Sequence, residues 1–286
     1  MGKKGWMAWL TAILLMVMTG AAQAQVYLSP PPEGIAPLLT WTVLDVDEGD
    51  AMLLESGGKT LLVDGGPWAF RDRLRLRLAE LGHLHLDTVL STHDHDDHID
   101  GLYSLFCSGF TAGEYLHGYS DRALQQKERA NRTAQAAADG GASIRRAAHG
   151  ETLTLGSCRV QVYQCIAIDN TNARSLVLRV TCGGTALLLC ADITGAAQHW
   201  LLDNLPPEML RADVIKLPHH GITPTVTDFL DAVDPAAMIV TNRPDRIQPG
   251  SQSQLDYRAL PVLFSGLGEV QGVTDGQDWY FWQAER

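Results

Sequence analysis

The sequence predicts a mixed α/β fold, with one large domain over residues 39–286. Short runs of β-branched and aliphatic residues recur along the chain and are bounded by glycine and aspartate, as is typical of strands. The first of these runs follow one another through glycine turns, which indicates antiparallel pairing, unlike a Rossmann sheet. A later run at 185–190 is almost wholly apolar and so predicts a strand buried on both faces, and 213–217 predicts another buried strand.

Helical segments lie between these runs. Leu74, Leu78 and Leu81 recur at helical spacing before Gly82, which predicts an amphipathic helix with a glycine stop. The stretch 123–138 has high helix propensity and many charges, and so predicts a solvent-facing helix. The expected elements, in chain order, are strands within 40–55 and at 59–63, a helix at 71–81, a strand at 86–90, helices from 99 and over 123–138, strands within 151–166 and at 175–180 and 185–190, a helix at 198–205, a strand at 213–217, a helix at 224–232, and strands at 236–241 and 279–282.

Three histidines and three aspartates fill positions 93–98, in a loop after the strand at 86–90. Lysine and arginine are absent from these six positions, so an acidic surface turn explains the cluster poorly. Neutral imidazole and carboxylate are ligands that suit Zn²⁺ or a similar divalent ion. His93 and His95 are two residues apart on an extended loop and can point the same way, whereas Asp97 and His98 leave on another side. The segment therefore predicts ligands for two ions.

Polar residues also end three other predicted strands. Asp64 precedes two glycines, where it is either a turn former or a residue beneath the histidine loop; the two roles are compatible. Asp192 ends a buried strand, and a carboxylate there requires a cation or hydrogen-bond partners. His219 and His220 are adjacent at a strand end and must diverge. We predict that His219 binds metal and that His220 contacts an anionic oxygen or protonates a leaving group.

The pattern His93-x-His95-x-Asp97-His98, with Asp64-Gly65-Gly66 upstream, resembles the metallo-β-lactamase superfamily of dinuclear hydrolases. Five further blocks resemble, in order, the soluble hydrolase domain of ComEC-type DNA-uptake proteins, and they are 44–51, 58–66, 175–180, 187–192 and 214–221. The resemblance spans about residues 41–235 and implies an αββα sandwich that binds two divalent ions. It implies that Asp192 bridges the ions and that Asp64 orients the histidine loop. With His219 chosen for its place nearest the strand end, the expected ligands are His93, His95, Asp97, His98, Asp192 and His219.

The chain departs from this superfamily between positions 150 and 192, where most dinuclear members carry a further histidine. Asn172 stands near that position, and its amide oxygen is a weaker ligand than imidazole. The site with His93 and His95 is therefore expected to be loose, which favours Mn²⁺ or easily exchanged Zn²⁺. Residues 47–50 and Ile222 also differ from the family pattern, so the substrate is not carried over from the resemblance.

Two ions at such a site would lower the pKa of a bridging water, whose hydroxide attacks phosphorus or a carbonyl carbon. We expect Asp97 to orient this nucleophile, and His220 or Lys216 to stabilise the developing anion. Asp45 and Asp50 are further candidates for residues that support the ligands, although for Asp50 a place in a solvated hairpin is the preferred interpretation.

The N-terminus has the layout of a secretory signal peptide. Lys3 and Lys4 precede an apolar run at 6–18 and small residues that end in Ala22-x-Ala24. We expect cleavage after Ala24, an extended lead-in over 25–38, and an exported protein that is secreted, periplasmic or on the cell surface, with no stable membrane embedding after cleavage. An uncleaved membrane anchor is the alternative. Loss of the two lysines changes the formal net charge from −11 to −13, which disfavours tight non-specific nucleic-acid binding.

The five cysteines include no Cys-x-x-Cys spacing, and their odd number leaves at least one without an intramolecular partner. Buried free thiols and a structural disulfide are both open for Cys158, Cys165, Cys182 and Cys190. His83 and His85 are expected at the surface, and His117 and His149 in loops with no role in metal binding.

Three functions fit these observations. The first is a metal-dependent phosphodiesterase or nuclease, with DNA among its candidate substrates. The second is a secreted hydrolase of another ester, such as a wall phosphodiester, a lactone or a β-lactam. The third is an exported binding protein with a degenerate, non-catalytic site.

Overall fold

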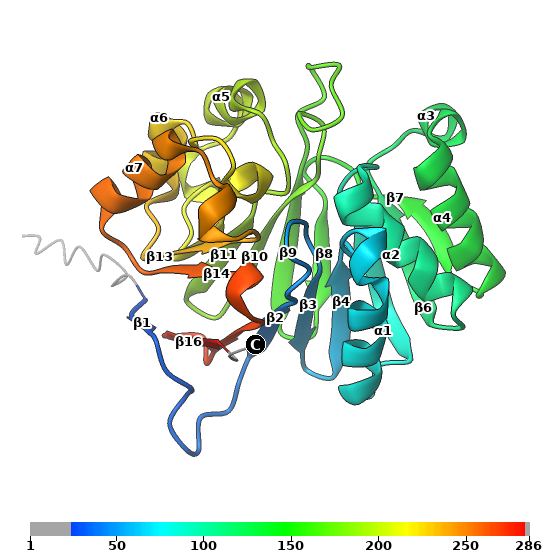
Figure 1. Cartoon of the computed structure of the whole chain (residues 1–286), viewed down its shortest axis with the longest axis horizontal. Coiled ribbons are helices and arrows are strands. Elements are labelled where there is room, and N and C mark those ends of the chain that lie inside the picture. Colours follow the sequence, from blue (N-terminus) through cyan, green and yellow to red (C-terminus); the bar gives the residue numbers. More distant parts are fainter. Residues whose placement is uncertain (1–23, 284–286) are drawn as a thin grey trace, which may run out of the picture.

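The computed structural model describes residues 24–283. The predicted signal peptide, except for Ala24, lies outside the described residues. Two sheets pack face to face, and helices cover the outer face of each (Figure 1). The mixed α/β class and the αββα sandwich are therefore confirmed.

The first sheet has nine strands in the order β1-β16-β15-β2-β3-β4-β5-β6-β7. The glycine-linked strands β2, β3 and β4 pair antiparallel as predicted, whereas β4 to β7 run parallel. Its members are β1 (Val26–Tyr27), β2 (Leu39–Val43), β3 (Met52–Ser56), β4 (Lys59–Val63), β5 (His85–Ser91), β6 (Thr111–His117), β7 (Ser143–Arg146), β15 (Val270–Thr274) and β16 (Trp279–Gln283).

The second sheet has seven strands in the order β14-β13-β12-β11-β10-β9-β8. Strands β11 to β14 run parallel, and β8 to β11 pair antiparallel. Its members are β8 (Thr152–Leu155), β9 (Cys158–Tyr163), β10 (Val177–Cys182), β11 (Thr185–Leu189), β12 (Val214–Lys216), β13 (Ala237–Val240) and β14 (Val262–Phe264).

Three apolar layers hold the sandwich together. The central layer lies between the sheets and includes Trp41 and Phe281, whose rings meet edge to face. The outer layers join each sheet to its helices, as Figure 1 shows. The helices are α1 (Arg71–Glu80), α2 (Asp96–Cys107), α3 (Asp121–Gln126) and α4 (Glu128–Asp139) beside the first sheet, and α5 (Gly195–Asn204), α6 (Thr227–Val233) and α7 (Pro249–Arg258) on the second. Short 3-10 helices lie at Trp68–Phe70, Pro207–Met209, Pro218–Gly221, Pro244–Arg246 and Ser265–Leu267.

Some local predictions need correction. The single helix expected over 123–138 is two helices, because the backbone at Lys127 is extended. The second of them, α4, is not fully solvent-facing, since Ala130, Ala134 and Ala137 are buried against the first sheet. His117 ends strand β6 and is buried, whereas a loop was expected. The lead-in at 25–38 contains the short strand β1, which pairs with β16.

Across residues 24–283, every helix is too short or too polar to cross a membrane.

Candidate metal centre

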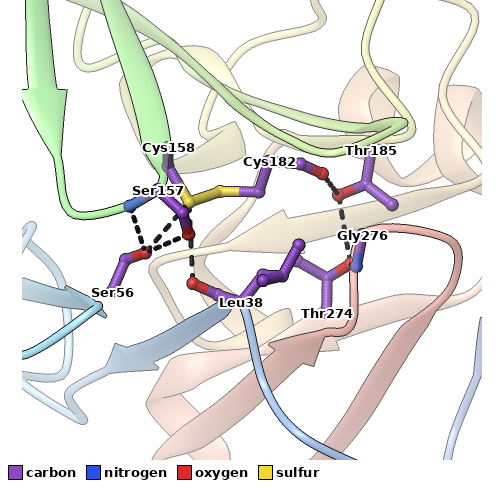
Figure 2. Close-up of a disulfide and its surroundings, with 8 residues drawn as sticks. All are labelled: Leu38, Ser56, Ser157, Cys158, Cys182, Thr185, Thr274 and Gly276. Carbon is purple, nitrogen blue, oxygen red and sulfur yellow. Dashed lines mark hydrogen bonds between the residues drawn. A yellow bond between two sulfur atoms is a disulfide. The ribbon is translucent and has the colours of Figure 1, made fainter.

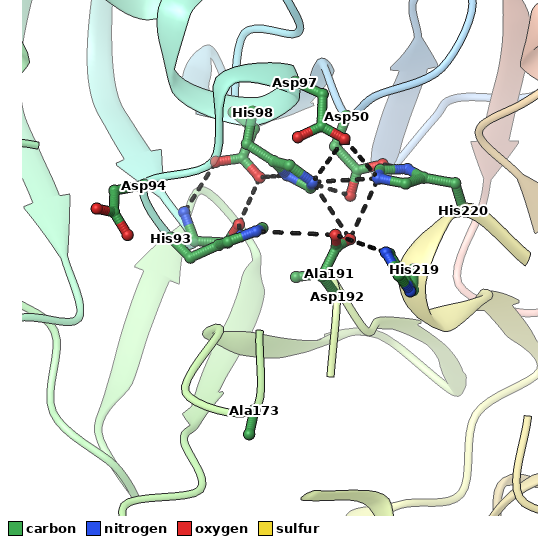
Figure 3. A network of polar contacts seen from close by, with 12 residues as sticks. Asp50, His93, Asp94, Asp97, His98, Ala173, Ala191, Asp192, His219 and His220 are labelled. Atoms are coloured by element: carbon green, nitrogen blue, oxygen red, sulfur yellow. Dashed lines mark hydrogen bonds and ion pairs between the residues drawn. The ribbon is translucent and has the colours of Figure 1, made fainter. Parts of the chain in front are cut away.

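The predicted site residues gather at one edge of the sandwich, where parallel strands end. Asp64 follows β4, the loop at 92–95 follows β5, Asp192 follows β11 and His220 follows β12. Parallel strands bring their carboxyl ends to the same edge, so residues far apart in the chain meet there. Figure 3 shows the side chains converging from these elements.

The backbone at this edge is unusual for residues other than glycine. Asp64, Ala191, His219 and His220 all have positive φ, between 44° and 57°. Such conformations are disfavoured for residues with a Cβ, and they persist where the surrounding structure imposes them, often at functional sites. At His219 and His220 they send two adjacent imidazoles in different directions.

Three ligand atoms face one another at the centre of the site. Nε2 of His98 lies 3.2 Å from Nε2 of His220 and 3.2 Å from Oδ1 of Asp192, and Nε2 of His220 lies 3.3 Å from the same oxygen. Ligand atoms about 2.0–2.1 Å from a tetrahedral ion are roughly 3.3 Å apart. The three atoms therefore have the spacing of one face of a coordination tetrahedron. Oδ2 of Asp97 lies 3.1 Å from Nε2 of His220, on the more open side.

A second group of ligand atoms shares Asp192 with the first. Atoms of His93, His95 and Asp192 lie within 4.8 Å of one another, as do atoms of Asp50, His98, Asp192 and His220. Nε2 of His93 lies 3.7 Å from Oδ2 of Asp192. Nε2 of His93 and Oδ1 of Asp192 are buried without a hydrogen-bond partner, which is costly unless a ligand satisfies them. The residues present thus fit two divalent ions joined by the Asp192 carboxylate.

Asp64 orients two of the imidazoles from below. Nδ1 of His98 lies 2.7 Å from Oδ2 of Asp64, and the Thr92 hydroxyl donates to the same oxygen at 2.6 Å. Nδ1 of His93 lies 3.1 Å from that hydroxyl. With the proton of each ring held at Nδ1, each Nε2 lone pair faces the centre, which is the tautomer that a metal ligand needs.

Asp50 and Thr241 hold the third imidazole in the same manner. Nδ1 of His220 lies 3.0 Å from the Thr241 hydroxyl, which donates to Oδ1 of Asp50 at 2.7 Å. Asp50 is fully buried, so its expected place in a solvated hairpin is wrong. Its partner is Lys216, whose ammonium lies 2.6 Å from Oδ2 of Asp50 and donates to the Ala191 carbonyl at 3.0 Å.

The comparison with known proteins fits this geometry. Residues 44–165 match the sequence profile described as the metallo-beta-lactamase superfamily. The structure of YhfI from Bacillus subtilis, described as a metallo-beta-lactamase fold protein, superposes with a TM-score of 0.54 over 79% of this chain and 96% of YhfI, at 13% identity. This chain has the metallo-β-lactamase fold. No curated protein has a sequence that matches it.

A second structure with this fold is the CmlA β-hydroxylase in a mutant form, at 14% identity and a TM-score of 0.52, over 82% of this chain and 53% of that one. The chain thus spans about half of CmlA. At these identities the likeness to both structures concerns the metallo-β-lactamase fold alone.

The electrostatics of the centre depend on the balance between burial and close opposite charges. Burial lowers the pKa of His98, but the carboxylates of Asp192 and Asp64 outweigh it and raise that pKa to about 10. Burial lowers the pKa of His220 as well. The nearby charge of Asp192 and the hydrogen bonds to Asp192 and Asp50 outweigh burial, so this pKa lies well above its ordinary value. Burial and the nearby charge of His98 hold the pKa of His93 well below its ordinary value. A cation that binds here takes the place of protons, as is usual for metal sites.

The positions predicted for His219 and His220 are reversed in this metallo-β-lactamase fold. His220 is fully buried within the four-residue group, whereas the side chain of His219 is 39% exposed and its Nε2 lies 3.9 Å from Oδ2 of Asp192. The structure therefore brings His220 to the centre and leaves His219 at the rim. The sequence contains no signal for this choice, because it depends on two backbone angles.

Lys216 was expected near the substrate. The structure places its side chain in full burial behind Asp50, so the ammonium does not reach the open side of the site. Its contacts position Asp50 and, through Thr241, the ring of His220.

Asn172 occupies the stretch where the further histidine of other dinuclear members was expected. Its Oδ1 is buried without a hydrogen-bond partner. The segment is tied to the histidine loop, since the Leu176 amide donates to the Thr92 carbonyl at 3.1 Å. A buried amide oxygen in this state is costly unless a water or another group satisfies it.

Sequence reasoning missed Thr92 and Thr241 and misjudged Asp50. The only sequence signals for Thr92 and Asp50 are positional, since Thr92 precedes the histidine run and Asp50 lies in one of the blocks that carry the resemblance. Of the histidines interpreted as bystanders, His83 contacts Glu55 at 2.7 Å and His85 is exposed. His117 and His149 lie in neither group of candidate ligands.

Proposed function

We propose that this protein is an exported, metal-dependent hydrolase that cleaves phosphodiesters with water activated at two divalent ions, Zn²⁺ or Mn²⁺. The observation that carries the proposal is the pair of ligand groups that share the Asp192 carboxylate. Two such ions, when bound, would make a bound water more acidic and would stabilise the charge that develops on the phosphoryl oxygen.

The chain's own residues supply orientation and proton handling. Burial raises the pKa of Asp97, but the hydrogen bond from His220 and the nearby charge of His98 outweigh it and hold that pKa at about 2. Asp97 is thus ionised at neutral pH and partly open to solvent, so it accepts a hydrogen bond from an attacking water and orients it. Burial lowers the pKa of His219, and its neutral ring at the rim donates an N–H to an anionic substrate oxygen.

A phosphodiester is the preferred substrate because of the sequence blocks that resemble ComEC-type hydrolase domains. A β-lactam is less favoured, because enzymes of that kind normally keep the histidine whose place Asn172 takes. A degenerate binding protein is also less favoured, since such a protein has no need to retain the buried, mutually oriented imidazoles of His93, His98 and His220.

Export is supported by the disulfide between Cys158 and Cys182. Disulfides persist in oxidising compartments and are rare where thiols are kept reduced. The bridge agrees with the signal peptide expected over residues 1–24.

The activity is tested with bis-p-nitrophenyl phosphate in the presence of Mn²⁺ or Zn²⁺. Asp97→Ala should reduce kcat by about 10²-fold or more, because it removes the group that orients the nucleophile. Asp96→Ala is the matched control, since Asp96 is in the same motif but is exposed. Equal activity of the two variants would contradict the role of Asp97.

A substrate panel separates the remaining functions. Single- and double-stranded DNA are compared with the small diester. We expect the small diester to be cut faster, because the formal net charge of −11 becomes −13 when the expected signal peptide is removed. A lactone and a β-lactam complete the panel. A metal-loaded protein that hydrolyses none of these compounds would overturn the proposal in favour of a binding protein.

A further inference from the structure

A pocket of about 280 Å³ is lined in part by Tyr119 and Lys127, which both contact Asp94. Its walls come from α3, the end of β7 and the connection between β9 and β10, which rises above the sheets (Figure 1). This volume is at the small end of ligand sites and suits one small group. The residues that matter below are Tyr119, Lys127, Arg146, Gln164, Thr171 and Arg174.

Asp94 links the pocket to the histidine loop of the metal centre. Asp94 stands between His93 and His95 in sequence, and Figure 3 shows its carboxylate turned away from the imidazoles. The Tyr119 hydroxyl donates to Oδ1 of Asp94 at 2.9 Å, and the Lys127 ammonium lies 3.2 Å from the same oxygen. A group bound in the pocket is therefore adjacent to the loop that carries the candidate ligands.

Positive charge gathers in the pocket of this otherwise acidic chain. The Arg146 guanidinium has no hydrogen bond or ion pair with any residue in the described range 24–283, and it is free to bind a ligand. The Lys127 ammonium contacts Asp94 and donates to the Thr171 hydroxyl at 3.0 Å, which leaves one of its three N–H groups. Arg174 pairs with Asp169, whose side chain is 95% exposed, and its Nε donates to the Ile168 carbonyl at 2.8 Å. Three cations thus face two carboxylates, and an arginine fork matches a phosphate.

The wall also contains an unsatisfied acceptor. Gln164 is 4% exposed, and its Nε2 donates to the carbonyls of Gly118 and Arg174 at 3.1 and 2.8 Å. Its Oε1 is buried without a partner. A buried acceptor in this state costs free energy, and an O–H or N–H group of a ligand would satisfy it. The ligand chemistry that fits both features is an anion on a hydroxylated or amide-bearing scaffold.

We infer that this pocket binds a second, non-reacting phosphate group of the substrate while the metal centre cleaves the first. The inference rests on the proposed phosphodiesterase function and narrows it to diesters of phosphorylated sugars or nucleosides. The phosphate contacts Arg146 and the remaining N–H of Lys127, and the sugar or base donates to Oε1 of Gln164.

The kinetic test compares two chromogenic esters that differ by one phosphate: the p-nitrophenyl ester of thymidine 5′-phosphate and the same compound with a 3′-phosphate. The wild-type protein, loaded with Mn²⁺, should prefer the 3′-phosphorylated ester about tenfold in kcat/KM, through a lower KM. In Arg146→Ala this ratio should fall to near one. Arg159→Ala is the control, because it removes the same charge from the outer face of the second sheet and should keep the wild-type ratio.

A binding measurement separates failure of this inference from failure of the proposed function. By calorimetry, the wild-type protein should bind thymidine 3′,5′-bisphosphate about tenfold more tightly than thymidine 5′-monophosphate, and Arg146→Ala should lose this difference. If neither ester is hydrolysed but the binding difference holds, the pocket stands and the phosphodiesterase proposal fails. If both esters are cleaved equally well, or if Arg146→Ala binds the bisphosphate as the wild type does, the phosphate pocket is overturned.

Discussion

Each buried imidazole of the centre is held at Nδ1 by a threonine, a carboxylate or both. Asp64 serves His98 directly and His93 through Thr92, whereas Asp50 serves His220 through Thr241. Asp50 precedes β3 and Asp64 follows β4, which is its neighbour in the first sheet, and the two carboxylates act in the same way. Such hydrogen bonds select the tautomer and fix the ring, so the ligand atoms are placed before an ion arrives.

The structure places His220 at the centre and His219 at the rim, and single-residue variants test this arrangement. His220→Ala should lower metal affinity by about 10²-fold or more, because it removes one of the three ligand atoms that face one another at the centre of the site. His219→Ala should keep the wild-type metal content and lose turnover instead. Metal content after dialysis, measured by emission spectrometry, distinguishes the two. A His219→Ala protein that has lost as much metal as His220→Ala would contradict the arrangement seen here.

The buried pair of Lys216 and Asp50 leads to a second test. Lys216→Met leaves a buried carboxylate without its cation and should destabilise the fold by roughly 3–5 kcal/mol. The double variant Lys216→Met/Asp50→Asn should lose less than the sum of the single variants, since neither charge then remains. Urea unfolding gives these free energies. Additive losses would show that the two side chains do not act as a pair.

At the scale of elements, helix α2 packs against the turn at residues 64–66, which follows β4 and carries Asp64. A Cβ built on Gly101 would lie 1.9 Å from the carbonyl oxygen of Gly65. The Gly65 amide donates to the His98 carbonyl at 2.7 Å, and the Gly101 amide donates to the Gly66 carbonyl at 2.9 Å. Backbone therefore packs directly on backbone, and this contact sets the distance between His98 and Asp64.

Gly101→Ala should push α2 away from this loop. We expect a loss of about 2–3 kcal/mol in the free energy of unfolding, because the clash is with backbone and cannot be relieved by a rotamer change. Gly140→Ala, at the end of α4, is the control, since its nearest neighbour lies at 3.3 Å and its φ is negative. Thermal unfolding measures both. If the two variants lose the same stability, the close approach at Gly101 is not a determinant of the fold.

At the scale of the whole molecule, the disulfide lies where the two sheets meet (Figure 2). Cys158 at the start of β9 is bonded to Cys182 at the end of β10, and Sγ of Cys158 also contacts the Ser56 hydroxyl of the first sheet at 3.3 Å. Beside it, the hydroxyls of Thr185 and Thr274 join the sheets at 3.0 Å. The bridge therefore anchors a hairpin of the second sheet next to the first.

Replacement of both bridge cysteines by serine should cost about 3 kcal/mol of stability, because the bridge closes a loop of 24 residues. The denatured but unreduced wild type should titrate three thiols, those of Cys107, Cys165 and Cys190. Five thiols in protein isolated from an oxidising compartment would show that the bridge does not form.

Local pattern in the sequence was sufficient to predict the fold class, most of the strands and the set of residues around the centre. The run at 93–98, Asp64 and Asp192 stand out because their chemistry is unusual where they occur, at the ends of apolar strands. The order of the αββα layers came from the resemblance, since local periodicity does not say which strands pair.

Only the tertiary structure decided which histidine faces the centre, that Asp50 is buried with Lys216, and that Cys158 pairs with Cys182. Positive φ angles at His219 and His220 turn the rings, and such angles are imposed by packing rather than by local preference. Asp50 and Lys216 are brought together by different sheets, and the cysteines by the register of β9 on β10. Contacts between distant segments depend on the whole chain's packing, which no local stretch of sequence contains.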